Sequence, residues 1–194
     1  MTKENIVDVD GMRIELFLSP EKVEKKGLHM AHLSHGSKIV TLQSGNEDLA
    51  DCDALMTENH EFSLGIKTAD CAPVCFNDEK RIGIAHVGWR GLCLGLIEKM
   101  MTHFDTAALT VYVAPFLHSF EIQKDFCYEQ IIKKFGERHF ERQSDKLIFN
   151  FKDAIGSLLP PQAVCDPRNT ATELSFPSHR RKTNSRFVTV VSFP

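Results

Sequence analysis

Three side chains of types that bind metals or act as nucleophiles stand out in this chain: His35, Cys71 and His86. Zinc at a catalytic site takes three nitrogen or sulfur ligands and leaves a fourth position for water or substrate. These side chains could supply such a set, although no two of them lie close together along the chain. Because nine histidines offer many other triples, the spacing alone leaves a metal site as one of several interpretations.

Each of the three residues also has an interpretation without a metal. His35 precedes Gly36 and would suit a turn, and Cys71 could be a buried structural thiol. A neighbouring histidine lowers the pKa of a thiol, so Cys71 and His86 could instead form a thiolate–imidazolium nucleophile. A metal would compete with that use, because a coordinated sulfur is not free to attack. Among the other histidines and cysteines, His29 and His32 are interpreted as surface residues or as residues behind the ligands, and the core is expected to contain Cys75, Cys93, Cys127 and Cys165.

The elements around Cys71 and His86 must bring the two residues together. Residues 72–76 and 81–87 are short apolar runs joined by a turn-like Asn-Asp-Glu-Lys sequence, which predicts a pair of strands. Glycines then bracket Trp89 and Arg90, and apolar residues recur at helical spacing over 91–104. The pattern predicts a strand, a glycine turn and a helix, whose free backbone N–H groups would favour an anion such as phosphate.

Four more side chains near these elements are candidates for contact with a substrate. Trp89 could stack on a flat base or fill the core. Arg90 could hold phosphate through two hydrogen bonds or pair with a surface carboxylate. Asp70 could orient the turn, tune the ligands from behind or serve as general acid, for which it is the first candidate. Arg180, in the run His179 to Lys182, could be solvated or could reach the pocket as an anion clamp.

The rest of the chain predicts a mixed α/β (α+β) fold with more strands than a βαβ alternation. Asp10-Gly11 between alternating apolar residues predicts a hairpin, and Pro20 to Lys26 predicts a short charged helix. Asp125 and Gly136 would cap a helix with Phe126 facing inward. Further strands are expected over 38–43, 53–57, 62–68, 109–114, 146–151, near 163 and over 186–193, and a further helix over 152–159.

Composition narrows the class of protein. At 194 residues and 42% hydrophobic, the chain is long enough for one well-filled core, which predicts a single domain. A net charge of −3 gives no electrostatic footprint for nucleic acid. No apolar run approaches the roughly 18 residues that span a membrane, and residues 1–11 lack a signal-peptide pattern. Six scattered cysteines suit a reducing compartment, so a cytoplasmic location without membrane or nucleic-acid partners is expected.

Four motifs, in order, resemble those of the laccase-domain family. They are Ser34-His35-Gly36, the run from Asp53 to Thr57, the run from Thr68 to Val74 and the run from His86 to Gly91. Members of this YfiH-like family were first called multicopper polyphenol oxidoreductases and were later described as purine nucleoside phosphorylases. The likeness continues through Pro115 and Glu121 to residues 178–181 and Arg186, and so covers most of the chain from residue 32 onward.

The resemblance implies a layered α-β-β-α fold with mixed sheets, a single domain over residues 1–194 and a shortened N-terminal region (1–30). It implies one zinc bound by His35, Cys71 and His86, with copper also possible. The implied activity is phosphorolysis of adenosine, inosine and S-methyl-5′-thioadenosine, with adenosine deaminase activity. A purine nucleoside and phosphate would then be the partners. Two positions depart from the family pattern, Ala114 where glycine is expected and His179 where tyrosine is expected.

Three other functions remain open at this stage. A copper-dependent polyphenol oxidase would fit the older family name, but the paired His-X-His motifs of multicopper laccases are absent from the sequence. A Cys-His hydrolase would use Cys71 and His86, as the same fold is thought to do in deamidating toxins. A zinc-stabilised scaffold without activity would keep the metal and lose all turnover.

Overall fold

Two large β-sheets form the centre of the molecule, which is described by a computed structural model over residues 5–194. A third, smaller sheet and four α-helices complete the architecture of this described part. The mixed α/β class expected from the sequence is confirmed, since helices and strands both occur along the chain. The sheets are mixed as expected, because each large sheet contains parallel and antiparallel pairs of strands. The single domain predicted over 1–194 includes residues 1–4, which lie outside the described range.

The five-stranded sheet has the strand order β1-β2-β14-β6-β3. Its strands are β1 (Ile6–Val9), β2 (Met12–Phe17), β3 (Leu28–Met30), β6 (Ser63–Thr68) and β14 (Phe187–Ser192). Neighbours run antiparallel except β3, which runs parallel to β6. The hairpin predicted at Asp10-Gly11 is confirmed, and both turn residues have the positive φ, 26° and 78°, that favoured two-residue hairpin turns require.

The six-stranded sheet carries most of the candidate site and has the strand order β13-β9-β7-β8-β5-β4. Its strands are β4 (Ile39–Leu42), β5 (Ala54–Thr57), β7 (Ala72–Asn77), β8 (Ile82–Val87), β9 (Thr110–Val113) and β13 (Val164–Cys165). The predicted pairing of β7 with β8 is confirmed, and Pro73 lies opposite His86 in their antiparallel register.

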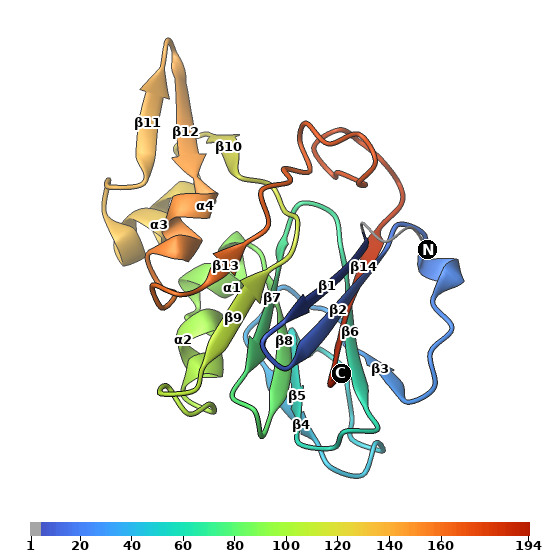
Figure 1. Cartoon of the computed structure of the whole chain (residues 1–194). Coiled ribbons are helices and arrows are strands. Elements are labelled where there is room, and N and C mark those ends of the chain that lie inside the picture. Colours follow the sequence, from blue (N-terminus) through green and yellow to red (C-terminus); the bar gives the residue numbers. More distant parts are fainter. Residues whose placement is uncertain (1–4) are drawn as a thin grey trace.

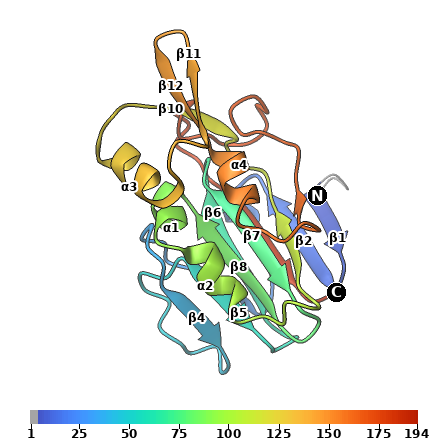
Figure 2. The ribbon, with the colours of Figure 1, turned by 90° about the vertical axis from the view of Figure 1, so that its left-hand side faces the viewer.

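Packing on both faces explains why β7 and β8 read as continuous apolar runs. Ile82 and Ile84 of β8 pack toward the five-stranded sheet, whereas Ala85 and Val87 pack toward the helices. A strand that is buried on both faces needs apolar residues at every position. Figure 2 shows α1 (Trp89–Cys93) and α2 (Leu96–Met101) lying over the face of this sheet that points away from the five-stranded sheet.

One continuous helix was predicted over 91–104, and this prediction is wrong. The structure has two short helices, α1 and α2, separated at Gly95, which has a φ of 77°. A left-handed residue cannot continue an α-helix, and glycine adopts this conformation at little cost. The predicted apolar stripe is nevertheless buried, because Leu92, Leu96 and Met100 all have no exposed surface.

A small outer unit lies beyond the six-stranded sheet (Figure 1). It contains α3 (Phe126–Phe135), α4 (Phe151–Gly156) and the sheet β10-β12-β11, formed by β10 (Ser119–Ile122), β11 (Phe140–Gln143) and β12 (Lys146–Asn150). The predicted caps of α3 are confirmed: the Asp125 side chain accepts from the N–H groups of Cys127 and Tyr128, and Gly136 ends the helix. The inward orientation of Phe126 was wrong, because this first helical residue is 63% exposed.

The helix predicted over Pro20 to Lys26 is reduced to one 3-10 turn, η2 (Pro20–Lys22). Beyond it the chain is tied to the five-stranded sheet, since the Lys25 ammonium donates to Glu15 and Ser192. These contacts and the positive φ of Gly27, 72°, keep residues 23–27 out of a helix. The same segment covers the outer face of the sheet, where Val23 packs on Val188 and Val190.

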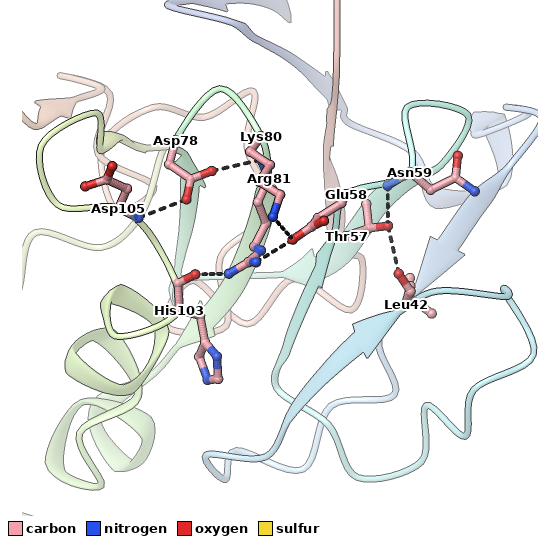
Figure 3. A network of polar contacts seen from close by, with 9 residues as sticks. All are labelled: Leu42, Thr57, Glu58, Asn59, Asp78, Lys80, Arg81, His103 and Asp105. Atoms are coloured by element: carbon pink, nitrogen blue, oxygen red, sulfur yellow. Dashed lines mark hydrogen bonds and ion pairs between the residues drawn. The ribbon is translucent and has the colours of Figure 1, made fainter.

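The turn between β7 and β8 is held by a network of exposed polar contacts, shown in Figure 3. Arg81 binds the Glu58 carboxylate at 2.5 Å, and the Lys80 ammonium lies 3.4 Å from the same group. Asp78 accepts hydrogen bonds from the backbone N–H groups of Arg81 and Asp105. This network lies at the opposite end of β8 from His86.

Among residues 5–194, no helix has both the length and the apolar composition that a membrane-spanning segment requires.

Candidate functional site

His35, Cys71 and His86 meet at one point in the structure. Their potential ligand atoms all lie within 4.8 Å of one another. Within residues 5–194, these three residues form the one group of His, Cys, Asp or Glu side chains that could hold a metal ion. The two imidazole rings lie edge to face, with centroids 4.8 Å apart. His35 comes from the loop after β3, Cys71 from the connection between β6 and β7, and His86 from the end of β8. Three separate segments therefore converge on the cluster.

The loop that carries His35 is shaped by the carboxylate of Asp53, which is fully buried directly before β5. One oxygen accepts from the His35 N–H at 2.9 Å, and the other accepts from the Gly36 N–H at 2.7 Å and the Ser34 hydroxyl at 3.0 Å. His35 has a φ of 61°, a conformation that is uncommon outside glycine. The Asp53 contacts offset the cost of this conformation.

Asp53 also fixes the orientation of His86. Its carboxylate oxygen lies 2.8 Å from Nδ1 of the buried imidazole, so Nε2 is the nitrogen left free to act as a ligand. Burial would raise the pKa of Asp53, but the hydrogen bonds from His86 and the Ser34–Gly36 loop lower it to about 2. Burial likewise opposes the charged form of His86, yet its bonds to Asp53 and Cys71 raise its pKa to about 9. A carboxylate behind a ligating histidine is a recurrent feature of metal sites.

Cys71 has the properties of a metal ligand or a nucleophile. Burial alone would raise the pKa of its thiol, but hydrogen bonds to His35 and His86 outweigh this and lower the pKa to about 7. Gly88 lies against the sulfur, since a Cβ added there would be 3.0 Å from Sγ. The glycine that follows β8 therefore provides the space in which the thiolate sits.

The cluster opens into a cavity of about 570 Å³, and every site residue predicted from the sequence lines it. These residues are His35, Asp70, Cys71, His86, Trp89, Arg90 and Arg180. The Trp89 ring contacts Phe126 edge-on at 6.2 Å between centroids, and the Arg90 guanidinium lies over the same indole at 4.8 Å. The predicted residues are thus brought together, while their individual roles stay predictions.

Asp70 is bonded to a second segment of chain. It has a φ of 84°, and its carboxylate accepts from the Thr170 hydroxyl at 2.7 Å and from the Arg180 backbone N–H at 2.8 Å. Both oxygens therefore hold the segment that brings Arg180 to the cavity. A role as general acid would require a proton on one of these oxygens, at a lone pair that these contacts leave free.

Some other expectations change once the structure is considered. α1, which follows Gly88, has only five residues, so the anion-binding effect of a long helix N-terminus does not apply there. His29 packs against Phe62, away from the cluster. Of the cysteines expected in the core, Cys75 is fully buried, whereas Cys93, Cys127 and Cys165 are half-buried.

Sequence reasoning assigned no role to several residues of the site. Asp53 stands in one of the recognised motifs, and a carboxylate at the start of a buried strand is the signal that could have identified it. The cavity lining also includes Leu33, Lys67, Phe120, Phe151 and Arg186. These come from distant segments, and only the tertiary fold reveals that they belong together.

Comparison with known proteins gives consistent matches. The model of the protein family described as multi-copper polyphenol oxidoreductase laccase matches residues 9–193 of this chain. A purine nucleoside phosphorylase of Aquifex aeolicus is 27% identical over 184 residues, 86% of this chain and 83% of the relative. A purine nucleoside phosphorylase of Staphylococcus saprophyticus is 32% identical over 63% of this chain and 48% of its own length.

Two solved structures have the same fold. A Neisseria meningitidis protein superposes with a TM-score of 0.82 at 19% identity and covers 97% of this chain and 99% of its own. The Bacillus licheniformis hypothetical protein YfiH superposes with a TM-score of 0.76 at 22% identity and covers 90% of this chain and 77% of its own.

Proposed function

The chain belongs to the multi-copper polyphenol oxidoreductase laccase family, and from that premise we propose that it is a zinc-dependent purine nucleoside phosphorylase. The proposed substrates are adenosine, inosine and S-methyl-5′-thioadenosine, with adenosine deaminase as a second activity. The observation that carries the proposal is the His35–Cys71–His86 cluster at a cavity that also contains Trp89 and Arg90. The names of the Aquifex and Staphylococcus relatives support it.

The donor set fits zinc. One thiolate and two imidazoles are ligands that zinc prefers, and three protein ligands leave a position for water or substrate. The same ligands also suit copper, so the identity of the metal is part of the proposal. When bound, zinc would supply Lewis acidity and lower the pKa of a coordinated water. Asp53 would keep the proton on Nδ1 of His86 and thereby hold Nε2 toward the metal.

In phosphorolysis, an oxygen of phosphate forms a bond to C1′ of the ribose while the bond from C1′ to the purine nitrogen breaks. The purine leaves with the electron pair and takes up a proton. Arg90 would hold the phosphate through its planar guanidinium, and Trp89 would stack on the purine. Rate enhancement would come mainly from holding the reactants in line.

Asp70 and Arg180 complete the proposed machinery. Arg180, which also lines the cavity, would contact the anion or the ribose. We propose that Asp70 positions Arg180 through its backbone N–H, with proton donation to the leaving purine as the alternative. Asp70→Asn separates these roles: loss of a general acid removes the alkaline limb of the pH–rate profile, whereas a positioning defect lowers kcat/KM at every pH.

The test is metal analysis followed by assays of base release. Purified protein should contain one zinc per chain, and Cys71→Ala should lose it. Free base should form from adenosine or inosine only in the presence of phosphate, and ammonia release from adenosine should accompany it. Equal base release without phosphate would reject phosphorolysis. Zinc retained without any turnover would indicate the non-enzymatic scaffold.

A second candidate, the Cys-His hydrolase, is favoured by one observation, the thiol pKa of about 7 at Cys71 beside His86. Metal-free protein would then react rapidly with iodoacetamide at Cys71, and zinc would block the reaction. Hydrolase activity that increases on removal of zinc would support this candidate over the phosphorylase. We further propose a cytoplasmic location, with small molecules and neither nucleic acid nor membrane as partners.

A further inference from the structure

The cavity beside the cluster carries positive charge on two of its walls. Arg90 lies at the start of α1, on the side of the six-stranded sheet, whereas Lys67 and Arg186 come from the five-stranded sheet. Arg180 reaches the cavity from the loop before β14. The proposed function uses one phosphate, at Arg90. It leaves the cations of the second wall without a role.

Strand register brings two of these cations to one place. Lys67 of β6 lies opposite Val188 of β14 in the antiparallel pairing. Arg186 lies directly before β14, two residues before Val188; continued strand spacing would place it diagonal to Lys67, and both side chains line the cavity. Such diagonal neighbours are separated by about 7–8 Å, a spacing from which both side chains can reach a single oxyanion.

Carboxylates do not neutralise this charge. In residues 5–194, no ion pair is formed by Lys67, Arg90, Arg180 or Arg186. Asp70, the one carboxylate in the cavity lining, is already bonded to Thr170 and to the Arg180 N–H. Among the residues that the structure describes, the Arg186 guanidinium donates only to the carbonyl of Ser185. A concave surface with unpaired cations attracts anions strongly.

The charge and the available space exceed what one inorganic phosphate requires. A phosphate carries at most about two negative charges near neutral pH, while four cationic side chains line the cavity. An adjoining hollow of about 660 Å³ shares His179 and Arg180 with the cavity and adds Lys182 to its lining. A ligand longer than a nucleoside therefore has both room and charge complementarity in this direction.

We propose that Lys67, Arg180 and Arg186 form a second oxyanion site, which binds a phosphate monoester at the 5′ end of the nucleoside. The substrate class would then include nucleoside 5′-monophosphates. This inference rests on the proposed function for the first phosphate and for the purine. The same oxyanion chemistry could also be met by a second free phosphate, so the experiment must distinguish the two sources.

Equilibrium binding to the zinc-loaded protein, measured by calorimetry, tests the site without relying on turnover. The ligands are adenosine, adenosine 5′-monophosphate and inorganic phosphate. We expect the monophosphate to bind at least about tenfold more tightly than adenosine at low salt, because Lys67, Arg180 and Arg186 contact its phosphate. This advantage should shrink as salt is raised, since exposed charges are screened.

Matched variants locate the effect. In the double variant Lys67→Met and Arg186→Gln, the ratio of the two dissociation constants should fall toward one. The control double variant, Lys133→Met and Arg142→Gln, removes the same charges from exposed positions outside the cavity lining, and it should keep the wild-type ratio. A ratio that changes equally in both double variants would overturn the site, because only net charge would then matter.

Each remaining outcome of the binding experiment supports or overturns one of the two proposals. Monophosphate binding no tighter than adenosine would overturn the nucleotide assignment. If, in addition, inorganic phosphate binds at two positions and loses one in the Lys67–Arg186 variant, the oxyanion site takes free phosphate instead. Tight monophosphate binding without any base release from adenosine would leave the second site intact and reject the phosphorylase. The two proposals therefore fail separately.

Discussion

The two ends of the β7–β8 hairpin use charged residues in opposite ways. At the turn, Glu58 pairs with Arg81 and Lys80 in exposed surroundings. At the other end, Asp53 pairs with His86 where both side chains are at most 3% exposed. Exposed pairs contribute about 0–1 kcal/mol, whereas removing one partner of a buried pair costs about 3–5 kcal/mol. The same strands thus carry an adjustable surface contact at one end and a fixed polar centre at the other.

The strongest test of this contrast is Asp53→Ala. The substitution leaves the His86 imidazole and the N–H groups of His35 and Gly36 without their acceptor, so we expect a loss of about 3–5 kcal/mol in the free energy of unfolding. Urea denaturation of the metal-free protein measures this. Zinc affinity, measured by chelator competition, should fall by about 10–100-fold in the milder Asp53→Asn. An Asp53→Ala protein as stable as the wild type would remove the distinction between the two ends.

A substitution of Asp166 tests whether burial or position in the site determines how much stability is lost when a carboxylate is replaced. This carboxylate is buried outside the cavity lining, where Tyr112 donates to it at 2.6 Å and Arg168 at 2.6 Å. We expect Asp166→Asn to cost about 1–3 kcal/mol at pH 7, the usual cost of a buried polar group left unsatisfied.

The pH dependence of this cost has a defined sign. Burial would raise the pKa of Asp166, but the hydrogen bonds from Arg168 and Tyr112 outweigh it and lower the pKa. Its contribution is therefore complete above the ordinary carboxyl pKa of about 4 and is lost as the pH falls below that value. Urea unfolding from pH 7 to pH 3 should show the wild type and Asp166→Asn converging at low pH. A constant difference would contradict the assignment.

Arg90 tests the comparison further, because its side chain is exposed although it follows the end of β8 at which Asp53 and His86 are buried. Arg90→Lys keeps the charge and loses the planar fork, so the KM for phosphate should rise about tenfold or more, equivalent to about 1.4 kcal/mol. Zinc content and Tm should barely change. An unaltered KM together with a clear fall in Tm would make Arg90 a structural residue and end its role as phosphate clamp.

The smallest effect is expected at the turn. Glu58→Gln removes the partner of Arg81 and Lys80 and should cost no more than about 1 kcal/mol, and the loss should decrease further in high salt. Thermal unfolding at two salt concentrations measures this, with the phosphorylase assay as a check that the site is unaffected. A loss as large as that of Asp53→Ala would show that the network in Figure 3 is as important as the buried pair.

Local signals made part of the fold predictable from the sequence. The Asp10-Gly11 turn and the Asn-Asp-Glu-Lys turn before Arg81 stand between apolar runs, so both hairpins followed. The strands that were missed, β3, β10 and β11, are short edge strands. β11 reads Phe-Glu-Arg-Gln and is largely exposed, because it pairs on one side only. β11 carries no alternating apolar pattern, and β10 alternates as Ser-Phe-Glu-Ile over four residues only.

The part of the site that lies within the recognised sequence motifs could be predicted. The histidine and cysteine types of His35, Cys71 and His86 limit the chemistry, and the motifs around them indicated that they meet. The carboxylate behind His86 comes from a residue 33 positions earlier, brought there by the pairing of β5 with β8. Arg186 and Lys67 line the same cavity because β14 pairs with β6. Tertiary register, which no local pattern encodes, made these contacts.

The position of β14 has a consequence for how the protein is made. This strand lies in the middle of the five-stranded sheet, between β2 and β6, yet the ribosome synthesises it after every other strand found in residues 5–194. The β1–β2 hairpin and β6 must therefore wait with open edges until Phe187–Ser192 has been translated. Closure of such sequence-distant pairings is slow and leaves apolar strand edges exposed meanwhile. Arg180 and Arg186 reach the cavity in the same late step, so we expect nascent chains released before β14 to be captured by chaperones and to lack a binding-competent cavity.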